Sequence, residues 1–171
     1  MIEKKGFTLI ELVVYTALVT MIGGLVLGLM IPMYRAGVES RISRRINASG
    51  ALMMERLIRE SKDAESIVMA SSTFNTNPGV LVIRTTNAST SGGTMKFSLS
   101  NGRGLLTFGD DTSQFLTSSQ TNISELTFWH LVSSSSEATR VKISISDTRA
   151  SSTKARDFFD TAVLRGSYIN K

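Results

Sequence analysis

Apolar residues are concentrated near the start of the chain. Residues 12–34 include no charged side chain, and as an α-helix these 23 residues would measure about 35 Å. A bilayer's hydrocarbon core is about 30 Å thick, so the pattern predicts a transmembrane helix over residues 7–34. A removable secretory signal fits less well, because its apolar core runs about 7–15 residues and ends at a small-residue site that is missing here.

From residue 35 the pattern becomes amphipathic. Apolar positions recur at spacings of three, four or seven, with Ser49 and Glu60 between them, as expected of a helix with one buried face. The predicted stripe is Val38, Ile42, Ile46, Met53, Leu57, Ala64 and Ile67 or Val68. We therefore expect one helix from about Thr8 to Ala70, whose amphipathic half covers residues 35–70, and we interpret Gly37 and Gly50 as tolerated interruptions.

After residue 71 the sequence consists of short alternating runs separated by turn residues. Asn101-Gly102 is the strongest hairpin signal, and Gly109-Asp110-Asp111 marks a further turn. Strands are expected at residues 79–84, 95–100, 105–108, 123–132, 140–145 and 159–165. The prediction is an α+β fold: a β-rich head over residues 71–171, formed by an antiparallel sheet that the long N-terminal helix closes on one face.

Composition removes most kinds of catalytic site. The chain has no cysteine, which excludes disulfides, thiolate metal sites and a cysteine nucleophile. It has one histidine. We interpret His130 as a strand residue and Asp110-Asp111 as part of a turn rather than as a cation site. We therefore predict no enzyme activity, no metal and no cofactor.

The net charge of +5 is modest. Residues 71–171 hold ten Lys and Arg against seven Asp and Glu, so DNA is a weakly supported partner. Arg41, Arg44 and Arg45 could contact phosphates, although a solvated charged face is the simpler interpretation.

Glu11 is the one carboxylate at the start of the apolar run. A carboxylate within a membrane helix costs a few kcal/mol by insertion scales, so a partner is expected. Two interpretations remain open: Glu11 extends to the membrane interface, or it pairs with a positive group of another chain.

The segment Lys4-Lys-Gly-Phe-Thr-Leu-Ile-Glu11 resembles the processing site of type IV pilins and type II secretion pseudopilins. The resemblance implies cleavage between Gly6 and Phe7 by a prepilin peptidase, which leaves residues 1–6 as a leader, and N-methylation of Phe7. It further implies that Glu11 is the assembly residue and pairs with the new amine of a neighbouring subunit. The aromatic strand at residues 126–130 and the run at 159–165 are similar to minor pilins and minor pseudopilins.

The resemblance also implies partners and a location. The partners are other pilin or pseudopilin subunits, an inner-membrane assembly platform and the lipid bilayer. The location is the cytoplasmic membrane, with an extracytoplasmic head and a surface filament after assembly. Basic residues counted near the helix ends, Lys4 and Lys5 against Arg35 and the arginines that follow, would place the head in the cytoplasm, and we follow the resemblance instead.

Inside the apolar run, Gly23, Gly24, Gly28 and Pro32 predict local softness, because glycine lowers helix stability by roughly 1 kcal/mol relative to alanine. Gly24 and Gly28 also form a GxxxG spacing, which lets membrane helices approach closely. The alternative function from a different class is a monomeric signal-anchored membrane protein whose extracytoplasmic β domain binds a ligand.

Overall fold

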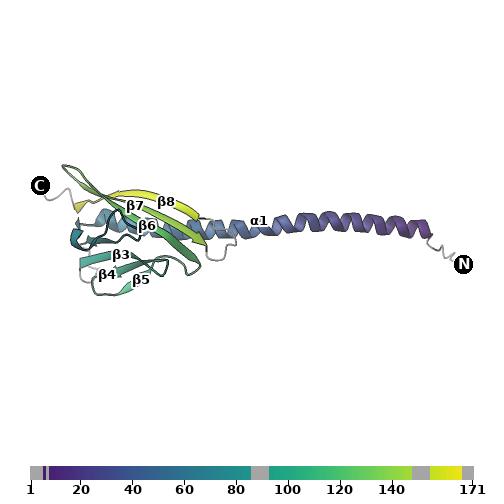
Figure 1. Cartoon of the computed structure of the whole chain (residues 1–171), viewed down its shortest axis with the longest axis horizontal. Helices are drawn as coiled ribbons and strands as arrows, with labels where there is room; N and C mark the ends of the chain where they lie inside the picture. The colour runs from purple at the N-terminus through teal and green to yellow at the C-terminus, as the bar shows by residue number, and fades with distance from the viewer. Residues whose placement is uncertain (1–5, 7, 86–92, 148–154, 167–171) are drawn as a thin grey trace. The chain divides into compact units, whose positions relative to one another are not determined.

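A computed structural model of the chain describes residues 6, 8–85, 93–147 and 155–166. The chain forms two compact units, residues 1–41 and 42–171. One long helix, α1 (Leu9–Asp63), begins in the first unit and ends in the second (Figure 1). In the second unit its C-terminal part packs on antiparallel strands, so the predicted α+β fold is confirmed.

The helix ends at Asp63, seven residues before the predicted end at Ala70. The Glu65 N–H donates to the carbonyl of Arg84 (2.8 Å), and residues Ser66–Ile67 form strand β1. A short 3-10 helix, η1 (Met69–Ser71), follows. The expected apolar positions at the end of the stripe are buried, but strand pairing with a distant segment overrides the local helical pattern.

The strands form two antiparallel sheets instead of the single sheet that we expected. The first sheet has the order β1-β2-β3-β4-β5, with β2 at Leu81–Arg84, β3 at Thr94–Ser100, β4 at Arg103–Phe108 and β5 at Ser113–Phe115. The second sheet has the order β6-β7-β8, with β6 at Thr121–Val132, β7 at Glu137–Asp147 and β8 at Ala155–Val163.

Backbone hydrogen bonds at the outer edge of β6 explain the division into two sheets. Loop amides of Asn75 and Gly79 donate to the carbonyls of Phe128 (2.9 Å) and Leu126 (2.7 Å). These loop contacts occupy the edge at which a further strand of the first sheet would pair. The short strands β1 and β5 were not predicted, because two or three residues carry too little alternation to be recognised.

The hairpin between β3 and β4 is confirmed. Ser100 pairs with Arg103, and the two residues between them, Asn101 and Gly102, have φ angles of 51° and 69°. Both central residues with positive φ are typical of the type I′ turn that Asn-Gly favours.

The core of the second unit lies between the C-terminal part of α1 and both sheets. The predicted stripe is buried from Ile42 onward, whereas Val38 is 39% exposed, so its assignment to the stripe is wrong. Gly50 is also more than a tolerated interruption, because a Cβ at this position would overlap the ring of Phe158 on β8. The close approach of helix and strand requires a residue without a side chain there.

Candidate functional site at the start of the apolar helix

The first turn of α1 is closed by a reciprocal pair of side chains. The Thr8 hydroxyl accepts a hydrogen bond from the Glu11 N–H (3.4 Å), and Glu11 Oε2 accepts one from the Thr8 N–H (3.3 Å). The Thr8 hydroxyl also donates to Glu11 Oε2 (3.2 Å). This arrangement is a capping box, with Thr8 as the N-cap and Glu11 three residues later.

Glu11 therefore has a local role that our sequence prediction missed. The pattern Thr-x-x-Glu before an apolar run is the signal that would have revealed it. The carboxylate also lies in the first turn, where the partial positive charge of the helix N-terminus favours an anion. Within the described residues the Glu11 side chain is exposed, so these contacts leave it accessible to another group.

Of the two residues at the predicted cleavage position, the structure describes only Gly6. Gly6 is exposed and lies before the helix, without regular structure. Phe7, the predicted new N-terminus, lies outside the described residues. An exposed glycine outside the helix is accessible to a protease, because neither a side chain nor a helical hydrogen-bond ladder shields its backbone.

Beyond Glu11 the first unit presents an apolar surface. Every described residue from 8 to 34 is exposed except Gly23, which is half-buried. The hydroxyls of Thr16 and Thr20 donate to the helix backbone, at 2.9 Å to the carbonyls of Val13 and Ala17 respectively. The polar groups of these two threonines are therefore satisfied without water, as a membrane requires.

By length and composition α1 could cross a membrane, with a mean hydropathy of 2.2 in its most apolar window. A single apolar helix of this kind is compatible with a single-pass membrane anchor. Gly23, Gly24, Gly28 and Pro32 all lie inside an unbroken helix. The local softness that we predict around them is a dynamic property and stays a prediction.

The two polar sites considered in the head from the sequence lie on a strand and in a turn. His130 lies on β6 as predicted, where its ring stacks on Phe74 (5.5 Å between centroids) and its Nε2 is 3.7 Å from Glu137 Oε2. Asp110 lies in a turn and accepts hydrogen bonds from the N–H and hydroxyl of Thr112, at 3.1 and 2.6 Å. Across the described residues, no three His, Asp or Glu side chains are grouped as a metal site.

The basic residues that follow the apolar run have different surroundings. Arg44 is exposed, whereas Arg45 forms an ion pair with Asp147 on β7 (2.8 Å). The Asp147 side chain is fully buried, so Arg45 holds α1 to the second sheet instead of serving as a free phosphate contact.

On the outer side of the second sheet, one cation has a shifted pKa. The pKa of Lys142 is raised above 10.5, chiefly by its hydrogen bond to the carboxylate of Glu125 (2.6 Å) and further by the negative charges of Glu125 and Asp157. Partial burial acts in the opposite direction. Lys142 and Arg140 are the two basic residues that line the hollow on this face, and the pair with Glu125 neutralises the charge of Lys142.

No family model, no curated protein and no solved structure matches this chain. The likeness to pilins therefore depends on residues 4–11 and on the order of helix and strands. The geometry on which a functional proposal can be based is the first turn of α1 with its exposed carboxylate.

Proposed function

We propose that this chain is a pilin-like structural subunit, without catalytic activity, that is processed before Phe7 and assembles into a filament through α1. We further propose that it serves as a minor pilin or a minor pseudopilin. The observation that carries the proposal is Glu11: an exposed carboxylate in the first turn of a helix whose next 23 residues carry no charge.

Filament assembly would explain why a carboxylate is present at position 11. Removal of residues 1–6 would turn Phe7 into an α-ammonium group. In the low dielectric of a membrane, attraction between opposite charges is far stronger than in water, and an unpaired charge is penalised. Pairing between the Phe7 amine of one subunit and Glu11 of the next would therefore fix the axial register of neighbouring helices.

The capping box supports this role in the subunit before assembly. Hydrogen bonds from Thr8 compensate Glu11 Oε2 in part while no second subunit is present. These bonds are long, at 3.2–3.3 Å, so an ammonium can replace them without a large loss. The carboxylate thus exchanges a weak local donor for a strong intermolecular one.

The exposed apolar surface of residues 9–34 supports the same proposal. Side chains of this kind need a cover, either lipid in the free subunit or other helices in the filament. The partners are thus other pilin-like subunits, a prepilin peptidase and a membrane assembly platform. The location is the cytoplasmic membrane, with the head outside.

The decisive experiment is the intact mass of the mature protein isolated from its native host. We expect the loss of residues 1–6 and the gain of one methyl group on Phe7. Gly6→Leu should block processing because a side chain prevents close approach to the backbone. Gly28→Ala is the matched control, since a Cβ at Gly28 meets nothing within 4 Å. A mature protein that keeps Met1 would reject the proposal and leave the signal-anchored alternative.

A further inference from the structure

Strand β8 is a long sheet edge that lacks a second partner within the described part of the chain. It spans nine residues and pairs along its length with β7 alone. The edge strands of the first sheet, β1 and β5, have only two and three residues. At the far edge of the second sheet, loop amides of Asn75 and Gly79 bond to β6.

Among the described residues, little covers this edge. Seven of the nine residues of β8 are exposed, and only Phe158 and Ala162 are covered to any degree. Natural proteins shorten or cover long edges, because unpaired backbone N–H and C=O groups accept another strand. An edge that stays long and uncovered is therefore a candidate for strand addition.

The backbone indicates which groups of β8 face outward. The Thr161 N–H donates to the Asp160 carboxylate (2.7 Å). Alternate residues of a strand direct their backbone groups to the same edge, so Asp157, Phe159 and Val163 share the outward edge with Thr161. The Asp160 carboxylate protects one of these amides and is the group that an incoming strand would displace.

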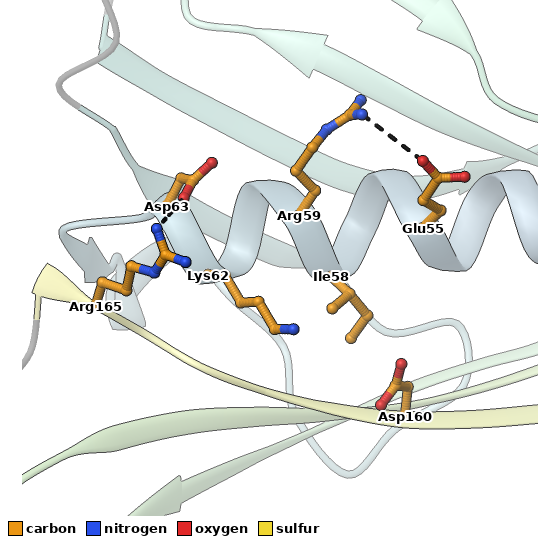
Figure 2. A pocket seen from close by; sticks show the side chains of 7 residues that line it. All are labelled: Glu55, Ile58, Arg59, Lys62, Asp63, Asp160 and Arg165. Carbon is orange, nitrogen blue, oxygen red and sulfur yellow. Dashed lines mark ion pairs between the residues drawn. The ribbon is translucent and has the colours of Figure 1, made fainter.

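A groove lies between this strand and α1 (Figure 2). It measures about 510 Å³, and its lining residues are Glu55, Ile58, Arg59, Lys62, Asp63, Asp160 and Arg165. Arg59 pairs with Glu55 (3.8 Å) and Arg165 pairs with Asp63 (3.6 Å). Figure 2 shows Lys62 and Asp160 directed into the space between helix and strand, and Lys62 has no ion-pair partner among the described residues.

The groove on the helix side of β8 is mainly charged, whereas the surface on the other face of β8 is mainly apolar. Alternate residues of the three strands line a second hollow of about 460 Å³: Trp129, Leu131, Arg140, Lys142 and Phe159. Phe159 and Leu131 are 55% and 44% exposed. A strand added to β8 would extend this apolar surface on one face and meet the charged groove on the other.

We propose that β8 binds an extended strand of a different polypeptide. In the bound strand, charged and apolar residues alternate. Its charged side chains face the groove, with a carboxylate beside Lys62 and a basic group beside Asp160. Its apolar side chains lie beside Phe159. Backbone hydrogen bonds give such a complex its affinity, and alternate side chains give it specificity. A second copy of β8 is a poorer occupant, since its two aspartates outnumber its one arginine, Arg156, and it would add net negative charge to an edge that already carries it.

This inference concerns the head alone and does not depend on filament assembly. It is tested by photo-cross-linking in the native host, with benzoylphenylalanine at position 159 of the full-length chain. We expect an adduct with another polypeptide, within a segment of alternating charged and apolar residues. In this background, Thr161→Pro removes one outward N–H and should lower the adduct yield about ten-fold, whereas Thr161→Val keeps it and should change the yield less than about two-fold.

A second pair of variants protects the test against misfolding of the sheet. Lys62→Glu reverses a charge on the helix side of the groove and should lower the yield about five-fold, since like charges then oppose each other. Lys96→Glu on β3, also exposed, is the matched control and should leave the yield unchanged. The proposal is overturned if no adduct forms, if the yield is insensitive to both Thr161→Pro and Lys62→Glu, or if only a second copy of this chain is captured.

Discussion

The ring of Phe158 on β8 occupies the space that a side chain at Gly50 of α1 would fill. Helix and strand approach this closely because Gly50 has no Cβ. Gly50→Ala should therefore lower the free energy of unfolding of the head by about 1–3 kcal/mol, since the ring must move. Denaturant unfolding followed by the fluorescence of Trp129, the one tryptophan, measures the change.

A matched substitution separates packing from helix propensity. Gly37→Ala is in the same helix, where a Cβ meets nothing within 4 Å, and should be neutral or stabilising by up to about 1 kcal/mol. Combining Gly50→Ala with Phe158→Leu should recover part of the loss. Equal effects of the two alanine substitutions would contradict the packing role of Gly50.

The Arg45–Asp147 pair predicts a stability effect that is unusual for an ion pair. Because the Asp147 carboxylate is fully buried, Arg45→Met would leave a buried charge with one partner fewer and should cost about 2 kcal/mol. Arg165→Met removes the pair with Asp63 (3.6 Å), in which the two side chains are 78% and 42% exposed, and should cost less than about 1 kcal/mol. Thermal unfolding of both variants provides the comparison, and equal losses would show that burial of Asp147 does not matter.

Local sequence patterns predicted the elements that have strong periodicity. The Asn101-Gly102 turn and the buried positions Ile42, Ile46 and Leu57 were predicted because turn chemistry and helical spacing are local signals. The end of α1 at Asp63 was not predicted, since it depends on the hydrogen bond from Glu65 to Arg84, about twenty residues away. The division into two sheets likewise depends on which loop bonds to β6, and alternation along a strand does not encode that choice.

The candidate site was predicted in part. Glu11 was evident because a charge in an apolar run is rare, but its neighbour Thr8 was overlooked as one more polar residue. The role of Gly50 was missed for a related reason: its meaning depends on Phe158, more than a hundred positions later. Contacts between distant residues carry this information, and a single sequence does not display them.

The pKa of Lys142 predicts a stability change in strongly alkaline solution. Since pairing with Glu125 raises this pKa above 10.5, the pair contributes its full stabilisation below pH 10.5 and loses it as the pH rises through the folded-state pKa. Glu125→Gln should shift the Lys142 midpoint back toward 10.5, and Asp157→Asn should shift it less, because Asp157 is the weaker cause. Titration of the Lys142 side chain by NMR measures both, and a midpoint that does not respond to Glu125→Gln would contradict the assigned cause.

The capping box allows the helix start and the charge of Glu11 to be tested separately. Glutamine also serves at the third position of a capping box, so Glu11→Gln should keep the first turn while it removes the charge that pairs with an ammonium. Thr8→Val keeps the charge, removes the capping hydroxyl and should destabilise the first turn by about 1 kcal/mol. Hydrogen exchange of the amides at the start of α1, measured in micelles, should therefore accelerate in Thr8→Val more than in Glu11→Gln.

Filament yield in the native host should show the opposite order. We expect Glu11→Gln to abolish filaments while the protein still inserts into the membrane, because a neutral amide cannot compensate the Phe7 ammonium. Thr8→Val should lower the yield only in proportion to the weakened helix start, since the carboxylate is still present. If Thr8→Val stopped assembly as completely as Glu11→Gln, an ordered first turn, rather than the charge of Glu11, would be what assembly requires.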